Sequence, residues 1–212
     1  MTAPTHQSRD NMACWTAKTV SMNWDILDRM ERAVTKVRER LLRATTALNQ
    51  AGVPYAVVGG NAVASWVATI DEGAVRTTRD IDLLVRRSDL PTITAALEQA
   101  GFVHDELLEV VMFRDGAEGK PSEAVRLLFA GEKTRPDHIL PAPEIQTVTD
   151  PANFPVITLE SLVSMKLMSN RRKDQVHLQD LISVRLIDPS WLTKLPPELA
   201  SRLKQILDTP DD

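Results

Sequence analysis

Two adjacent glycines, Gly59 and Gly60, separate a β-prone run from a helical run and limit how this chain can fold. Residues 55–58 read as a short strand, and the alanine-, valine- and tryptophan-containing residues 62–69 read as a helix. A glycine turn from a strand into a helix lets main-chain N–H groups approach phosphate oxygens at the helix N-terminus. Asn61 is a candidate cap for that helix. Such turns also occur for purely structural reasons.

The remaining periodicities place this unit in an α/β or α+β fold. Residues 24–51 repeat apolar side chains at helical spacing before Gly52 and Pro54. Further strands are predicted at residues 80–85, 109–114 and 124–129, and further helices at residues 90–100, 159–169, 173–184 and 197–207. This order predicts a small mixed sheet flanked by helices, followed by an all-helical C-terminal part.

The same pattern suggests a domain organisation. Residues 1–23 are polar and lack periodicity, so we expect disorder there. Residues 24–150 are predicted to form the α/β domain, ending in a proline-bearing surface loop at residues 131–153. Residues 151–212 are predicted to form a helical part packed on that domain.

Composition excludes several classes of protein. The chain has 212 residues, 43% of them hydrophobic, and a formal charge of −4, unlike polybasic nucleic-acid binders. Cys14 is the only cysteine, which excludes an internal disulfide and a cysteine-based zinc site. No apolar run is long enough for a membrane span, and the first residues do not resemble a signal peptide. We therefore expect a cytoplasmic protein.

Two aspartates, Asp80 and Asp82, lie two positions apart on a predicted strand. Because side chains alternate between the faces of a strand, both carboxylates should project to one side. Such a pair suits a divalent ion such as Mg²⁺, which prefers oxygen ligands shared with substrate phosphates. The other reading is a solvated acidic strand end.

Arg76, Thr78 and Arg79 immediately precede this acidic pair. Arginine suits phosphate because its planar guanidinium donates two parallel hydrogen bonds. Alternatively, Arg79 only balances the charge of Asp80.

Residues 57–60, Val-Val-Gly-Gly, and residues 76–85, Arg-Thr-Thr-Arg-Asp-Ile-Asp-Leu-Leu-Val, together resemble the signature of the polymerase-β-like nucleotidyltransferase superfamily. The resemblance implies that Asp80 and Asp82 hold Mg²⁺ or Mn²⁺ and take part in catalysis. It also implies a nucleoside triphosphate substrate, whose monophosphate passes to a hydroxyl acceptor with release of pyrophosphate. The residues that it implies for nucleotide binding in this region are Gly59, Gly60, Asn61, Arg76, Thr78 and Arg79.

The later segment 158–181 resembles the helical tail of the branch that contains AbiEii-type toxins. This resemblance implies a catalytic Lys166 and a nucleotide-binding Lys173 and Asp174, with a toxin–antitoxin role and a partner protein. The acceptor it implies is RNA, such as a tRNA, a protein or a small molecule. Alternatively, these three residues form surface ion pairs.

One position departs from the family pattern. Active members carry a third carboxylate on a later strand, and the aligned residue here is Arg126. A cation there would repel a second metal ion. If the register differs, Glu123 or Glu132 takes that position. The departure raises an alternative function, a catalytically degenerate relative that binds a nucleotide or a partner.

Overall fold

The computed structural model describes residues 10–107, 110–149 and 154–209, and for residues 10–24 the backbone alone. In chain order, its α-helices (α), strands (β) and 3-10 helices (η) are α1 (Asp10–Gln50), β1 (Tyr55–Val58), α2 (Gly59–Ala68), η1 (Glu72–Ala74), β2 (Ile81–Val85), η2 (Arg87–Asp89), α3 (Leu90–Gln99), β3 (Phe102–Leu107), β4 (Val110–Asp115), η3 (Pro121–Glu123), β5 (Val125–Phe129), β6 (Thr147–Thr149), β7 (Pro155–Ile157), α4 (Leu159–Ser169), α5 (Arg172–Ser183), η4 (Pro189–Thr193) and α6 (Pro197–Leu207).

The strands form one mixed, seven-stranded sheet in the order β3-β4-β5-β2-β1-β7-β6. Strand β2 runs antiparallel to β1 and parallel to β5, while β1 also runs parallel to β7. The four residues of β1 are all buried, which explains why this central strand is a continuous apolar run. The predicted α/β class with a mixed sheet flanked by helices is therefore confirmed.

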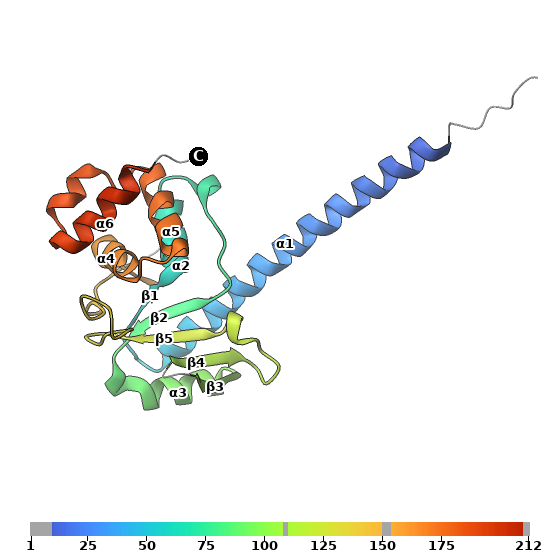
Figure 1. The fold of residues 1–212 in the computed structure, drawn as a ribbon. Helices are drawn as coiled ribbons and strands as arrows, with labels where there is room; N and C mark the ends of the chain where they lie inside the picture. Colours follow the sequence, from blue (N-terminus) through green and yellow to red (C-terminus); the bar gives the residue numbers. More distant parts are fainter. Residues whose placement is uncertain (1–9, 108–109, 150–153, 210–212) are drawn as a thin grey trace, which may run out of the picture.

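Helices cover the sheet in two groups. Helix α2 contacts β1, β2, α4 and α5, and α4, α5 and α6 contact one another, so the C-terminal helices gather around α2. Helix α3 contacts α1 and β3 at the other end of the sheet (Figure 1). The buried core runs through both groups, including Leu48, Leu83, Leu97, Leu162 and Leu181.

Helix α1 starts at Asp10 rather than near residue 24, where the apolar periodicity predicts it. Of the segment predicted to be disordered, residues 1–9 lie outside the described part. From Leu41 onward the helix packs its apolar side against the core, whereas Ile26, Met30 and Val34 are exposed. The outer half of α1 projects away from the rest of the molecule (Figure 1). The proposed domain boundary at residue 150 remains a prediction.

The strand-to-helix unit is tighter than the sequence pattern predicts. Helix α2 begins directly after β1, at Gly59, so the two glycines form the first turn of the helix. Strands β6 and β7 were not predicted, because three-residue strands carry too few residues for a detectable alternation. Among the described residues, no helix combines the length and the apolar character needed to cross a membrane.

Candidate functional site

The acidic pair and the two glycines meet at one edge of the sheet. Asp80 immediately precedes β2, and Asp82 lies within it, opposite Val58, the last residue of β1. A Cβ placed on Gly59 would lie 2.2 Å from Asp82 Oδ2, and one on Gly60 would lie 2.9 Å from Thr78 Cβ. Gly59 also has a φ of +69°, a conformation that other residues adopt at a cost. The Asp82 carboxylate therefore rests directly against the start of α2.

Asp80 is held by three side chains. Its Oδ1 accepts hydrogen bonds from Thr78 Oγ1 at 2.7 Å and Lys173 Nζ at 3.2 Å. Its Oδ2 accepts one from Arg126 at 2.9 Å. Burial opposes ionisation, but the Thr78 hydroxyl and the charge of Lys173 outweigh it and hold the pKa of Asp80 well below its usual range. Asp80 is thus a carboxylate at neutral pH.

Asp82 has the opposite tendency. Burial raises the pKa of Asp82, the nearby Asp80 charge raises it further, and Arg126, Lys166 and Lys173 offset part of the rise. The two neighbouring carboxyl groups therefore differ in acidity, and a cation between them would favour the ionised form of both.

Lys166 and Asp174 form a buried ion pair near the sheet edge that carries Asp80 and Asp82. Lys166 Nζ lies 3.1 Å from Asp174 Oδ1, and the side chains are only 7% and 1% exposed. Arg171 Nε also contacts Asp174, at 2.8 Å. Burial lowers the pKa of Lys166, and it opposes the ionisation of Asp174, whose pKa Arg171 and Lys166 nevertheless lower to about 2. The interpretation of these two residues as a surface ion pair is wrong, because both side chains are buried.

Lys173 precedes Asp174 on α5, but its side chain is 53% exposed and contacts Asp80. The C-terminal helices therefore bring Lys166, Lys173 and Asp174 close to the acidic pair, as the sequence resemblance implies. Their roles there remain predictions.

Two of the residues predicted to contact the nucleotide make hydrogen bonds within the protein, and their role in nucleotide binding remains a prediction. Asn61 does not cap α2, since its Nδ2 donates to the Asp80 carbonyl at 2.9 Å and the N-cap residue is Val58. Arg76 Nε lies 2.7 Å from Asp180 Oδ1 on α5. Arg79 is exposed, while the cations on Asp80 come from Lys173 and Arg126.

Arg40 is a residue that the sequence interpretation missed. It is 4% exposed, and its guanidinium contacts the Arg79 carbonyl at 3.2 Å, Asp115 at 3.3 Å and Glu123 at 3.4 Å. Arg40 thus ties α1 to the segment that carries Asp80. A signal was available, because Arg40 falls on the apolar side of the helix, next to Leu41 and one turn before Ala44.

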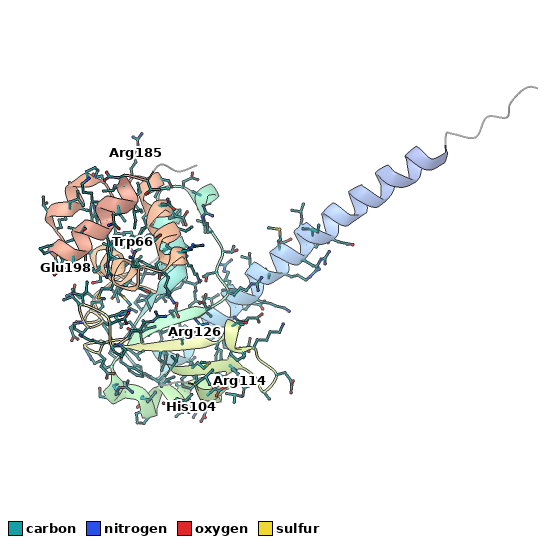
Figure 2. The ribbon with its side chains drawn as sticks, in the orientation of Figure 1. Trp66, His104, Arg114, Arg126, Arg185 and Glu198 are labelled. Atoms are coloured by element: carbon teal, nitrogen blue, oxygen red, sulfur yellow. The ribbon has the colours of Figure 1, made fainter. Side chains whose placement is uncertain are left out.

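The parallel register between β2 and β5 shows which β5 residue neighbours Asp82. Asp82 pairs with Arg126 (Figure 2 shows Arg126 on β5). Glu123 contacts Arg40, and Glu132 contacts Arg87 at 2.6 Å, so both alternative acids are engaged elsewhere.

Asp80 and Asp82 are the side chains at this edge that could hold a divalent ion. Asp80 and Asp82 offer carboxylate oxygens at the same edge, and the absent side chain of Gly59 leaves the space in which Asp82 sits. Within residues 10–107, 110–149 and 154–209, no cluster of three or more histidine, cysteine, aspartate or glutamate side chains is arranged to hold a metal. Arg126 places a positive charge beside both aspartates, and this charge disfavours a further cation there.

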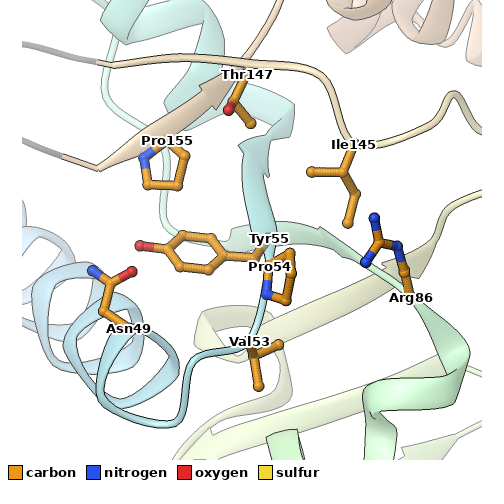
Figure 3. Close-up of a pocket in the computed structure, with 8 residues that line it drawn as sticks. All are labelled: Asn49, Val53, Pro54, Tyr55, Arg86, Ile145, Thr147 and Pro155. Atoms are coloured by element: carbon orange, nitrogen blue, oxygen red, sulfur yellow. The ribbon is translucent and has the colours of Figure 1, made fainter.

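A separate pocket lies at the opposite end of β1 (Figure 3). It is lined by Asn49, Tyr55, Arg86, Thr147 and Pro155, among others. None of the residues predicted for the site lines it. The candidate site is therefore the edge that carries Asp80 and Asp82.

Two solved structures share this fold. A solution structure of the antibiotic-resistance factor ANT(2'')-Ia aligns with 82% of this chain and 92% of its own, at 14% identity and a TM-score of 0.51. An antigenic nucleotidyltransferase-like protein from Paracoccidioides brasiliensis aligns with 82% of this chain and 88% of its own, at 18% identity and a TM-score of 0.53. At these identities the likeness concerns the fold alone.

Comparison with the sequences of known proteins identifies the family of the chain. A search of curated proteins gave no match. The model of a protein family described as uncharacterised nucleotidyltransferases matches residues 12–135, which is more than half of the chain and includes the glycine turn, the acidic pair and Arg126. The chain therefore belongs to this family of nucleotidyltransferases.

Proposed function

We propose that this protein transfers a nucleoside monophosphate from a nucleoside triphosphate to a hydroxyl acceptor, with release of pyrophosphate, in a reaction that depends on Mg²⁺ or Mn²⁺. The observation that carries the proposal is the contact between Gly59 and the Asp82 carboxylate. This contact supports the proposal because it puts the Asp82 carboxylate, the proposed metal ligand, beside the N-terminus of α2, where free N–H groups and the helix dipole favour phosphate.

In this proposal the residues bind and orient the nucleotide. The main chain at Gly59 and Gly60 binds the β- and γ-phosphates, and Asp80 and Asp82 hold the ion. When bound, the ion supplies charge neutralisation at the phosphates. Lys173, which is 53% exposed and contacts Asp80, contacts a phosphate oxygen in this proposal.

The chemical step forms a bond between the acceptor oxygen and the α-phosphorus. The bond from the α-phosphorus to the bridging oxygen breaks, and pyrophosphate leaves with the electron pair. Lys166 serves as the base for the hydroxyl proton or as a phosphate contact. Arg171 and Asp174 fix the position of Lys166.

The acceptor, the cellular location and the biological role belong to the same proposal. RNA such as a tRNA, a protein and a small molecule are the acceptor classes, and the cytoplasm is the proposed location. Membership of the AbiEii-like branch would add a toxin–antitoxin role and a partner protein. Fold kinship alone does not decide biological purpose.

Radiolabelled nucleotide transfer tests the activity directly. The purified protein is incubated with each α-labelled nucleoside triphosphate, Mg²⁺ and candidate acceptors, and pyrophosphate release is measured. Asp80→Asn and Asp82→Asn should lower turnover by more than about 10²-fold, whereas Asp28→Asn, at an exposed position on α1, should not. A folded protein that turns over none of the four nucleotides would contradict the proposal.

A second function, a nucleotide-binding relative without catalysis, is favoured by the Arg126–Asp80 ion pair at 2.9 Å. This function predicts nucleotide binding by calorimetry without turnover, and turnover that appears in Arg126→Asp. Wild-type turnover would exclude it.

A further inference from the structure

Arg126 takes a position in the sheet that brings its charge onto both aspartates. It neighbours Asp82 in the register between β2 and β5, and its guanidinium lies 2.9 Å from Asp80 Oδ2. The Arg126 side chain is 32% exposed and the Asp80 side chain 17% exposed, so the pair lies at the mouth of the site. A guanidinium there can donate to a carboxylate and to a phosphate at once, because it carries five N–H donors.

The charge of Arg126 can be compared with that of a second divalent ion. Exchanging a carboxylate for a guanidinium makes the local charge more positive by two elementary charges, which is the charge of one divalent ion. A site with a third carboxylate and two ions therefore has the same total charge as a site with Arg126 and one ion. The arginine thus supplies the neutralisation that a second ion would give.

The two cations on Asp80 differ in how firmly they are placed. Lys173 is 53% exposed at the end of a flexible side chain, and it contacts Oδ1. Arg126 is anchored in the middle of the sheet, between the β2 and β4 strands, and it contacts Oδ2. An ion can therefore replace Lys173 on Oδ1, while Arg126 keeps its place.

We propose that this site works with a single divalent ion, held by Asp80 and Asp82, and that Arg126 takes the place of the second ion by contacting the phosphates of the bound nucleotide. This inference rests on the proposed function, because it assumes that a nucleoside triphosphate occupies the site. Under this inference, Arg126 is a functional residue of the site, although the family pattern has a carboxylate at its position.

Counting bound ions tests the inference without reference to turnover. Mn²⁺ is titrated into the protein with each of the four α,β-methylene nucleoside triphosphates, and electron paramagnetic resonance gives the ions bound per protein-bound nucleotide. The wild type should bind one ion and Arg126→Asp two. Arg86→Asp is the matched control, since it makes the same change at an exposed position beyond the opposite end of β2, and it should bind one.

Arg126→Ala provides a second measurement in case the aspartate variant does not fold. Loss of the charge-assisted hydrogen bonds to phosphate should weaken analogue binding about tenfold at saturating Mn²⁺, with no change in Arg86→Ala. Two ions in the wild type, or unchanged affinity in Arg126→Ala, would overturn the inference and leave the proposed function standing. A wild type that binds neither analogue nor Mn²⁺ would overturn both.

Discussion

Replacing Gly59 by alanine probes the contact that brings the acidic pair to the start of α2. The new Cβ would lie 2.2 Å from Asp82 Oδ2 and 3.0 Å from Asp82 Cβ. Rotation of the carboxylate would relieve only the first of these contacts. Either β2 or the first turn of α2 would have to move, and both are part of the buried core.

Two costs add up at this position. Alanine in the left-handed region costs about 1–2 kcal/mol, and forced overpacking costs a further amount of about 1–3 kcal/mol. Gly59→Ala should therefore lower the free energy of unfolding by about 2–5 kcal/mol. Gly101→Ala is the matched control, because Gly101 has a φ of +85° but nothing within 4 Å of its added Cβ. It bears only the first cost.

Urea denaturation followed by circular dichroism measures both variants, and a third variant isolates the contact. In an Asp82→Ala background the carboxylate is absent, so Gly59→Ala should cost less than in the wild type by about 1 kcal/mol or more. Equal destabilisation by Gly59→Ala and Gly101→Ala, with no coupling to Asp82, would refute the close approach. The shared site would then lose its main support.

Two further predictions concern residues around the site. Arg40→Met should lower the free energy of unfolding by about 2 kcal/mol, because it removes the side-chain partner of the Arg79 carbonyl and of Glu123 and one of the two arginines on Asp115. Exposed Glu39→Gln is the control in the same urea assay, and an equal effect of both would contradict the buried role. Burial, helped by Lys166, lowers the pKa of His177 to about 4, so between pH 6.5 and 4 the unfolded state binds a proton that the native state does not. The free energy of unfolding should therefore fall by about 2 kcal/mol as the pH falls through this window, after allowance for solvent screening. His177→Gln should remove this part of the pH dependence. If the variant loses as much stability between pH 7 and pH 4 as the wild type does, His177 is not buried in neutral form.

The sequence predicts the fold class and the position of the acidic pair because both depend on local patterns. Strand β1 and helices α4 and α6 have the predicted boundaries, since their apolar periodicity ends at glycine, proline or polar residues. The outer part of α1 was not predicted, because residues 10–23 lack a helical apolar stripe. A helix can extend outward from a packed segment without such a stripe.

The partners of the charged residues could not be predicted from sequence. Arg76 pairs with Asp180 across 104 positions, and Arg126 pairs with Asp80 across 46. Such pairs depend on strand order and helix packing, which local spacing does not determine. For the same reason, the sequence predicted Arg126 as the residue aligned with the third carboxylate but not that it would neighbour Asp82 and contact Asp80.

Arg40 lies at the point where α1 leaves the body of the protein, and its guanidinium holds the carbonyl just before Asp80. Motion of the outer helix would thus be transmitted through this side chain to the segment that carries Asp80. A molecule that binds the projecting half of α1 would therefore affect the position of Asp80 from a distance, without contacting the site itself.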